Sequence, residues 1–242
     1  MKVCQSLAFL LLISMLLAAC ASKPPWEQTD PDKQARAYSD LGMGYLDAGN
    51  FSRSVREFSR ALELRPRHPQ ALHGMALTYQ AQGEYELAED YFKQTLRADR
   101  NKTSARNNYA AFLFEQSRYD EARAEFERAS QDMRYPNRAI VLENLGYVLL
   151  AKDDPITARA YFQQSLRNNP NVLGARRELL RLDLAEGQLS SAQRHWEQLE
   201  SRGSLDRDLL NLGIELALAT GNQQKQEELK QHLQVLNSQN TR

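Results

Sequence analysis

Apolar residues recur at helical spacing along most of the chain, and the pattern repeats. The offsets between successive repeats are 34, 34, 36 and 34 residues, marked by a small residue followed four positions later by an aromatic one: Ser54/Phe58, Ala88/Phe92, Ala122/Phe126, Ala158/Phe162 and Ala192/Trp196. A turn residue recurs in the same phase, at Gly49, Gly83, Ser117, Asp153, Gly187 and Gly221. Runs of helical period joined by such turns predict a tandem array of two-helix units.

The first unit carries the fullest motif, with Tyr38, Leu41, Gly42, Tyr45, Ser54, Phe58, Ala61 and Pro66. This motif resembles the tetratricopeptide repeat (TPR). The resemblance implies an all-α fold, a right-handed superhelical solenoid of about six TPR helix hairpins. The third and fifth units depart from the motif, because Arg106 and Arg176 replace an apolar residue and Asp183 replaces an aromatic residue or leucine.

The phase of the repeat predicts where each unit begins and ends. TPR 1 to TPR 4 are expected at residues 35–68, 69–102, 103–138 and 139–172, a degenerate TPR 5 at 173–206, a degenerate sixth unit with capping helices at 207–236, and a tail at 237–242. In the sixth unit the apolar stripe Leu229, Leu233 and Leu236 predicts a capping helix over 222–236. Two extra residues near Asp132 to Arg138 are either a tolerated loop insertion or a change in the rotation between repeats.

The first 19 residues predict a targeting signal, with Lys2 followed by an apolar run too short to span a bilayer. The run ends in Leu17-Ala18-Ala19-Cys20 and resembles a bacterial lipoprotein signal; an ordinary secretory signal with an incidental cysteine is the alternative. The resemblance implies cleavage before Cys20, which would carry a covalent N-acyl and S-diacylglycerol lipid. By the same resemblance, Ala21 favours the outer membrane. Residues 20–34 contain Pro24, Pro25 and Pro31, and are expected to be a non-helical tether.

The amino-acid composition supports a helical fold and excludes one class of binding partner. Ala and Leu together number 64, whereas Val and Ile number 10, which favours helices over sheets. Lys plus Arg and Asp plus Glu each number 31. A chain of zero net charge lacks the excess of cations that nucleic-acid binding needs, so no nucleic-acid partner is expected.

No constellation of residues predicts catalysis. The four histidines His68, His73, His195 and His232 have no metal-ligand partner at helical spacing, and no nucleophile elbow or phosphate loop occurs. We therefore expect no enzyme activity, no metal, no cofactor beyond the lipid and no small-molecule substrate.

Binding to another protein is the expected activity. By resemblance to TPR proteins, the first helix of each repeat lines a concave groove. Eight groove positions are candidate partner-binding residues: Met43, Leu46, His73, Leu77, Asn107, Phe114, Tyr147 and Leu150. They would form a mostly apolar strip suited to an extended or helical peptide, or else only fill the superhelix. In the fifth repeat, Arg177 and Arg181 are expected to face the groove and would suit an acidic segment of a partner.

The lipoprotein signal, the short tether and about six repeats together resemble the PilF/PilW family of type IV pilus biogenesis lipoproteins. Three segments sharpen the resemblance: Leu41 to Tyr45, Asn107 to Ala110, and Tyr135 to Arg138 leading into Glu143 to Gly146. The resemblance implies an outer-membrane pilotin, lipid-anchored with its body in the periplasm, that binds secretin subunits and promotes their localisation and multimerisation. It would also make the two-residue insertion a family feature. Another cell-envelope TPR scaffold, such as a β-barrel assembly component or a protease adaptor, is the alternative.

Overall fold

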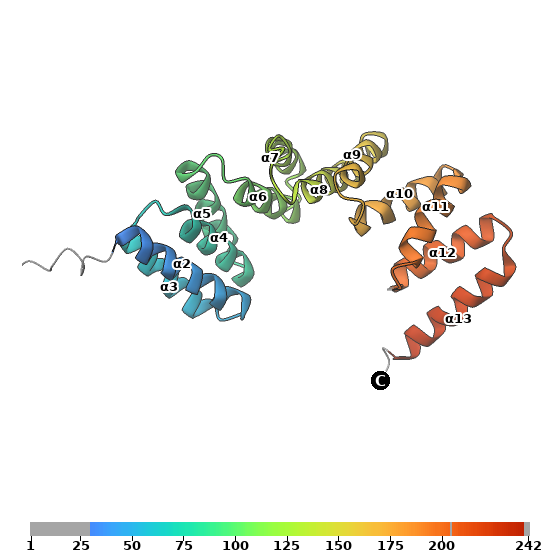
Figure 1. Cartoon of the computed structure of the whole chain (residues 1–242), viewed down its shortest axis with the longest axis horizontal. Helices are drawn as coiled ribbons and strands as arrows, with labels where there is room; N and C mark the ends of the chain where they lie inside the picture. The colour runs from blue at the N-terminus through green and yellow to red at the C-terminus, as the bar shows by residue number, and fades with distance from the viewer. Residues whose placement is uncertain (1–29, 204, 240–242) are drawn as a thin grey trace, which may run out of the picture. The chain divides into compact units, whose positions relative to one another are not determined.

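The computed structural model describes residues 30–203 and 205–239, where every regular element is an α-helix (Figure 1). The predicted signal peptide, Cys20 and the tether as far as residue 29 lie outside the described residues. The helices are α2 (Pro31–Asp47), α3 (Phe51–Leu64), α4 (Pro69–Gln82), α5 (Tyr85–Ala98), α6 (Thr103–Glu115), α7 (Tyr119–Ser130), α8 (Arg138–Ala151), α9 (Pro155–Asn168), α10 (Leu173–Ala185), α11 (Leu189–Glu200), α12 (Arg207–Ala219) and α13 (Gln223–Gln239).

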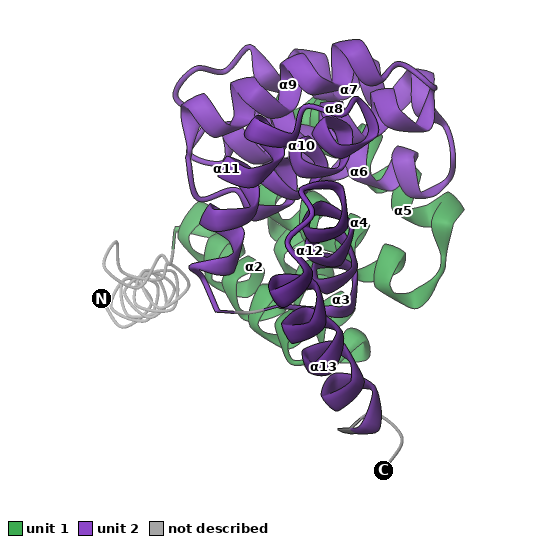
Figure 2. Ribbon diagram, turned by 90° about the vertical axis from the view of Figure 1, so that its right-hand side faces the viewer, with its two compact units in different colours: residues 1–99 green, residues 100–242 purple. Residues whose placement is uncertain are grey.

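Consecutive helices pack in pairs, from α2 with α3 to α12 with α13. The described residues therefore form six hairpins, which confirms the predicted all-α TPR architecture. The chain divides into two compact units, which we call unit 1 (described from residue 30 to Asp99, α2 to α5) and unit 2 (Arg100 onwards, α6 to α13) (Figure 2). Within each unit the first helices of successive hairpins also touch, as α2 touches α4 and α8 touches α10.

The turn inside each hairpin has one residue in the left-handed region of backbone space. The φ angles are 70° at Gly49, 79° at Gly83, 59° at Ser117, 56° at Asp153, 69° at Gly187 and 72° at Gly221. Glycine adopts this conformation without strain, and short polar residues tolerate it. The turn series read from the sequence thus corresponds to one recurring backbone geometry.

In unit 1 a single aromatic ring fills the space that two glycines leave. Phe58 is fully buried, and a Cβ atom built on Gly42 or Gly74 would come within 2.6 or 2.1 Å of its ring. Ser54, also buried, donates a hydrogen bond to the carbonyl oxygen of Gly42 (3.0 Å) and lies 3.0 Å from the hydroxyl of Thr78. The small residues predicted to let helices approach closely therefore do so around Phe58.

Unit 2 contains two apolar clusters of the same type. One surrounds Phe162, and the other surrounds Trp196 and includes Leu229 of α13. Leu233 and Leu236 pack against this second cluster. The apolar stripe predicted for the last helix is therefore the surface by which α13 covers the end of unit 2.

The first helix begins earlier than the sequence suggested. We expected a non-helical tether up to residue 34, but α2 starts at Pro31. Asp30 caps the helix by accepting a hydrogen bond from the backbone N–H of Asp32 (2.9 Å). Proline at the first helical position has a suitable φ and removes a donor that would be unsatisfied there, so Pro31 starts the helix rather than preventing it.

Two further boundaries differ or gain detail. Helix α13 continues to Gln239 and so includes the first three residues of the predicted tail. The insertion lies in the connection between α7 and α8, where residues 131–137 join hairpins that elsewhere in unit 2 are joined by shorter segments, such as 169–172. The side chain of Arg138 anchors this connection by donating to the carbonyl oxygen of Ser130 (2.7 Å).

Candidate partner-binding surfaces

In unit 1, the candidate residues occupy the first helices of the two hairpins. Met43 and Leu46 lie on α2, and His73 and Leu77 lie on α4, which packs beside α2. All four side chains are half-buried. Met43 contacts the Phe58 cluster, and the His73 ring lies 6.1 Å from the ring of Phe92. We call these four residues the first-helix face of unit 1. This face has half-buried apolar side chains, of which Met43 packs against the buried Phe58 cluster.

In unit 2, the remaining candidates are drawn into the packing of their own hairpins. Phe114 on α6 lies against Tyr119, with ring centroids 5.4 Å apart, and Tyr147 on α8 meets Phe162 edge-on at 5.4 Å. Leu150 packs against the Phe162 cluster, and Asn107 donates to the side-chain oxygen of Asn108 (3.3 Å). Each of the four is half-buried. In unit 2, therefore, these four side chains make many of their contacts within their own hairpins.

Next to Tyr147, a carboxylate reaches across to the following repeat. Glu143 of α8 accepts a hydrogen bond from the backbone N–H of Ala175, in the first turn of α10. A Cβ on Gly174 would meet the Glu143 carboxyl at 2.2 Å and the Tyr147 hydroxyl at 2.6 Å, so glycine is needed for this approach. Burial, together with the negative charge of Glu178, raises the pKa of Glu143. Burial and the nearby carboxylates also raise the pKa of Tyr147 to about 12.

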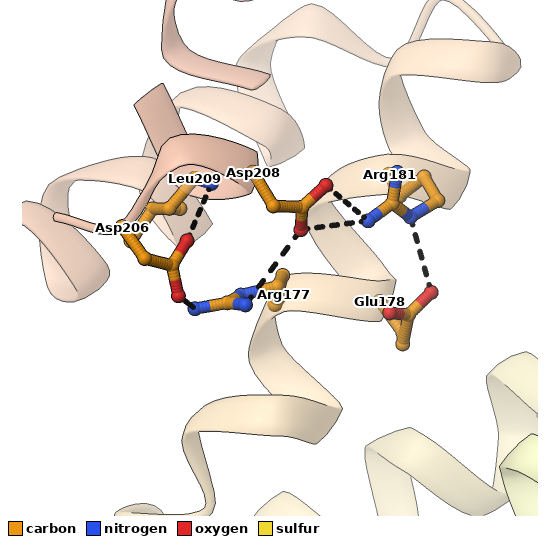
Figure 3. A network of polar contacts seen from close by, with 6 residues as sticks. All are labelled: Arg177, Glu178, Arg181, Asp206, Asp208 and Leu209. Carbon is orange, nitrogen blue, oxygen red and sulfur yellow. Dashed lines mark hydrogen bonds and ion pairs between the residues drawn. The ribbon is translucent and has the colours of Figure 1, made fainter. Parts of the chain in front are cut away.

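The two arginines expected to await an acidic partner already have acidic partners within the chain (Figure 3). Arg177 contacts Asp206 (2.6 Å) and Asp208 (3.6 Å), and Arg181 contacts Asp208 (2.9 Å) and Glu178 (3.3 Å). Asp206 is the N-cap of α12, where it also accepts from the backbone N–H of Leu209 (2.9 Å). Carboxylates of the chain, two of them from the next repeat, thus already engage both arginines, and the acidic partner segment expected there stays a prediction.

Sequence reasoning marked the unusual residues Arg106, Arg176 and Asp183 but found none of their partners. Arg106 pairs with Glu125 of α7 (2.5 Å). Arg176 bonds to the carbonyl oxygen of Pro170 (2.7 Å) and to the side chain of Gln198. A motif position that is usually apolar is thus held by a polar contact to a neighbouring helix or loop.

Asp183 is the most completely buried of these departures, with no exposed surface. It forms an ion pair with Arg159 of α9, which also contacts Glu186 (3.0 Å). His195 of α11 lies 3.7 Å from Asp183, but burial dominates and lowers the pKa of His195. The network ties α9, α10 and α11 together. Its signal in the sequence was a carboxylate at an apolar position, which implies a buried cation nearby.

The other histidine with a defined role is structural. His68 is the N-cap of α4, where its Nδ1 atom accepts from the backbone N–H of Ala71 (3.3 Å) and lies 3.2 Å from the Ser39 hydroxyl. Among residues 30–203 and 205–239, no group of three His, Cys, Asp or Glu side chains could hold a metal ion. Within the same residues, no helix has both the length and the apolar character needed to cross a membrane.

Comparison with known proteins assigns the chain to a family. The tetratricopeptide repeat model matches residues 33–101 and 103–171. The type IV pilus assembly protein PilF of Pseudomonas aeruginosa is 35% identical over 221 residues, which cover 90% of this chain and 87% of that protein. The chain belongs to the PilF/PilW family.

Solved structures of the PilF/PilW family share the fold. The structure of Pseudomonas aeruginosa PilF matches with a TM-score of 0.82 and 33% identity, covering 85% of this chain and 93% of that one. The structure of PilW, described as a widely conserved type IV pilus biogenesis factor, matches with a TM-score of 0.72 and 29% identity, covering 83% and 92%. The resemblance read from the sequence is confirmed. A family built on a repeat scaffold also agrees with the expectation that the chain is not an enzyme.

Proposed function

We propose that this chain acts in type IV pilus biogenesis as a lipoprotein of the outer membrane, where it binds secretin subunits and promotes their assembly. The observation that carries the proposal is the likeness to PilF over 90% of the chain. The Leu17 to Cys20 sequence, which resembles a lipoprotein signal, supports the anchor. In this proposal the lipid supplies the membrane address, and the folded repeats hold a secretin segment.

The first-helix face of unit 1 is the surface we assign to the secretin. Met43, Leu46 and Leu77 are apolar yet only half-buried, so a partner that covers them gains free energy from removing apolar surface from water. The charged side chains of α10 in unit 2 offer less, because ion pairs within the chain already engage them. An apolar segment of the partner, extended or helical, fits this surface.

The binding test places charges on that surface. We expect Leu46→Glu combined with Leu77→Glu to weaken co-purification of the secretin from detergent-solubilised membranes by about tenfold or more, because the interface would bury unpaired charges. Circular dichroism verifies that the helices remain. The matched control is Ile156→Glu on α9 combined with Leu218→Glu on α12, which adds the same two charges at side chains that are 83% and 66% exposed. Unchanged capture by the double variant would move the site to another surface.

The anchoring test changes Cys20 to Ser and follows the secretin. We expect fewer secretin multimers in the outer membrane and more unassembled subunits, while binding to the detached protein persists. Multimers at the normal level would show that the lipid is not needed. Capture of a different envelope protein, with no secretin among the products, would instead favour another scaffold or adaptor role.

A further inference from the structure

The lengthened connection between α7 and α8 borders a hollow of about 600 Å³ on unit 2. Four arginines line it: Arg100 before α6, Arg106 on α6, Arg128 on α7 and Arg134 in the connection itself. A volume of this size lies within the range of about 300–1,000 Å³ that is usual for small-molecule sites. Helices α6 and α7, which supply two of these arginines, follow one another along the chain in Figure 1.

The positive charge of the hollow is only partly neutralised within the chain. One carboxylate, Glu125, is shared by Arg106 and Arg128. The other, Asp132, uses one oxygen to accept from the Thr103 hydroxyl (2.7 Å) and the other to accept from the backbone N–H of Arg134 (3.1 Å). Four guanidinium groups thus face two carboxylates. A chain with equal numbers of acidic and basic residues has concentrated an excess of positive charge here.

Arg100 is the clearest sign that this excess serves a ligand. Its side chain is exposed and forms no ion pair within the described part of the chain, although its carbonyl oxygen accepts from Arg106 (2.8 Å). The side-chain amides of Asn101 and Gln131 also line the hollow. Converging guanidinium and amide donors match the oxygens of a phosphate group, since the planar guanidinium fork binds such oxyanions with two parallel hydrogen bonds.

We propose that this hollow binds a phosphate group, either as a free phosphate or as the headgroup of an anionic phospholipid. The insertion is what builds the site, because residues 131–137 contribute Gln131, Asp132 and Arg134. The extra residues near Tyr135 therefore have a chemical role that a tolerated loop would lack. The site lies wholly within unit 2, on residues other than the first-helix face of unit 1, so it adds a second ligand to the protein.

The test is a titration of the full-length protein in zwitterionic detergent, followed by amide NMR. Sodium phosphate should produce saturable shifts at residues 100–106 and 131–134, beyond those caused by sodium chloride at the same ionic strength. Arg100→Gln combined with Arg134→Gln should weaken binding by about tenfold or more, since each change removes a charge-assisted contact. Arg100→Gln alone should weaken it less, and this change breaks none of the ion pairs found among the described residues.

The matched control is Arg167→Gln combined with Arg207→Gln, which removes two exposed arginines of unit 2 that lie outside the hollow. This control should bind phosphate as the wild type does. Absence of saturable shifts in the wild type, or equal binding by the Arg100/Arg134 variant, would overturn the proposal. So would stronger binding of a hexaglutamate peptide than of phosphate at the same residues, because the hollow would then recognise an acidic polypeptide.

A second arm identifies the source of the phosphate. Dihexanoyl phosphatidylglycerol is compared with dihexanoyl phosphatidylcholine, both as dissolved monomers. Shifts with the anionic lipid, lost in the Arg100→Gln/Arg134→Gln variant, assign the site to a phospholipid headgroup. Shifts with inorganic phosphate but with neither lipid assign it to a soluble phosphate. A response to both lipids that the variant retains would contradict the site.

Discussion

In unit 1, the first helices carry the half-buried apolar side chains Met43, Leu46 and Leu77, whereas in unit 2 the first helix α10 carries Arg177 and Arg181, which form ion pairs with α12. Both units are built from the same repeat, but the free energy gained by covering these faces with a partner differs. Apolar side chains that stay half-exposed gain from being covered by a partner. Charged side chains that have found partners within the chain would lose those contacts on binding. The comparison teaches that equivalent faces of one repeat array can differ, with half-exposed apolar side chains in one unit and ion pairs between repeats in the other.

Removing one half of the buried ion pair in unit 2 should have the largest effect. We expect Asp183→Asn to lower the free energy of unfolding by about 2 kcal/mol, because the mostly buried Arg159 would lose its buried carboxylate and keep only Glu186. Arg159→Met combined with Asp183→Leu should restore most of this loss, since an apolar pair needs no charge compensation. Urea unfolding followed by circular dichroism measures both. Wild-type stability in Asp183→Asn would mean that unit 2 does not depend on its buried charges.

A pair of glycine substitutions sharpens the contrast at about 1 kcal/mol. Gly174→Ala gains helix propensity but displaces Glu143 from the backbone N–H of Ala175, so two effects of about 1 kcal/mol each should nearly cancel. Gly44→Ala, on α2 of unit 1, has nothing within 4 Å of the new methyl and should stabilise by about 0.5–1 kcal/mol through helix propensity. Gly44→Ala should raise the midpoint of thermal unfolding, whereas Gly174→Ala should leave it nearly unchanged. An equal rise for both variants would show that the contact between repeats in unit 2 contributes nothing.

The exposed ion pairs of unit 2 should matter less. Arg181 and Asp208 are each nearly half exposed, and pairs of this kind contribute about 0.2–1 kcal/mol. Arg181→Gln should therefore lower the free energy of unfolding by about 0.5 kcal/mol in low salt, and by less in high salt as screening weakens the pair. Urea titrations at two salt concentrations provide the measurement. A loss that persists in high salt would indicate that packing, rather than charge, accounts for the effect.

The smallest expected effect is a difference in pH dependence between two buried glutamates. For Glu57 in unit 1, burial acts to raise the pKa, but Arg56 and Arg60 outweigh burial and hold the pKa below its ordinary value of 4.5. Its contribution to stability is present above pH 4.5 and is lost as pH falls through the lowered pKa. For Glu143 in unit 2 the pKa is raised, so its contribution is complete below pH 4.5 and is lost as pH rises through the raised pKa.

Unfolding curves from about pH 2.5 to pH 7 test these signs against Glu57→Gln and Glu143→Gln, because the change for Glu57 lies below pH 4.5 and the change for Glu143 lies above it. Relative to Glu57→Gln, the wild type should gain stability as pH rises. Relative to Glu143→Gln, it should lose stability over the pH range just above 4.5. Slopes of the same sign for both comparisons would contradict the difference between the two sites.

The fold was predictable because its determinants are local and periodic. Small and aromatic residues at fixed spacing, such as Ser54 and Phe58, predict where helices cross, and the turn residues predict where the chain reverses. The start of α2 is also encoded locally, since Asp30 before Pro31 is a helix-start signal, although the three prolines of residues 20–34 together favour a non-helical segment. Single positions of this kind need the conformation of their neighbours, which the repeat pattern does not provide.

The chemistry of the first-helix faces was less predictable, because charge pairing depends on residues far apart in sequence. From the sequence alone, Arg181 is expected to be available to a partner. In the structure it donates hydrogen bonds to Asp208 from the next repeat. From the sequence alone, Asp183 is only a departure from the repeat motif. In the structure it forms an ion pair with Arg159 from the preceding repeat. Repeat periodicity predicts which helix a residue occupies, but it does not predict which long side chain from a neighbouring helix reaches that residue.

The hairpin turns of the two units lead to one further consequence. All six keep a positive φ, although Ser117 and Asp153 stand where the others have glycine. What the six turns have in common is thus a backbone angle, and the residue at that position can be any of the few types that tolerate it. A search for divergent copies of the repeat in other chains should therefore look, at a fixed interval, for any residue type that tolerates a positive φ. A search for glycine alone would miss turns such as those at Ser117 and Asp153.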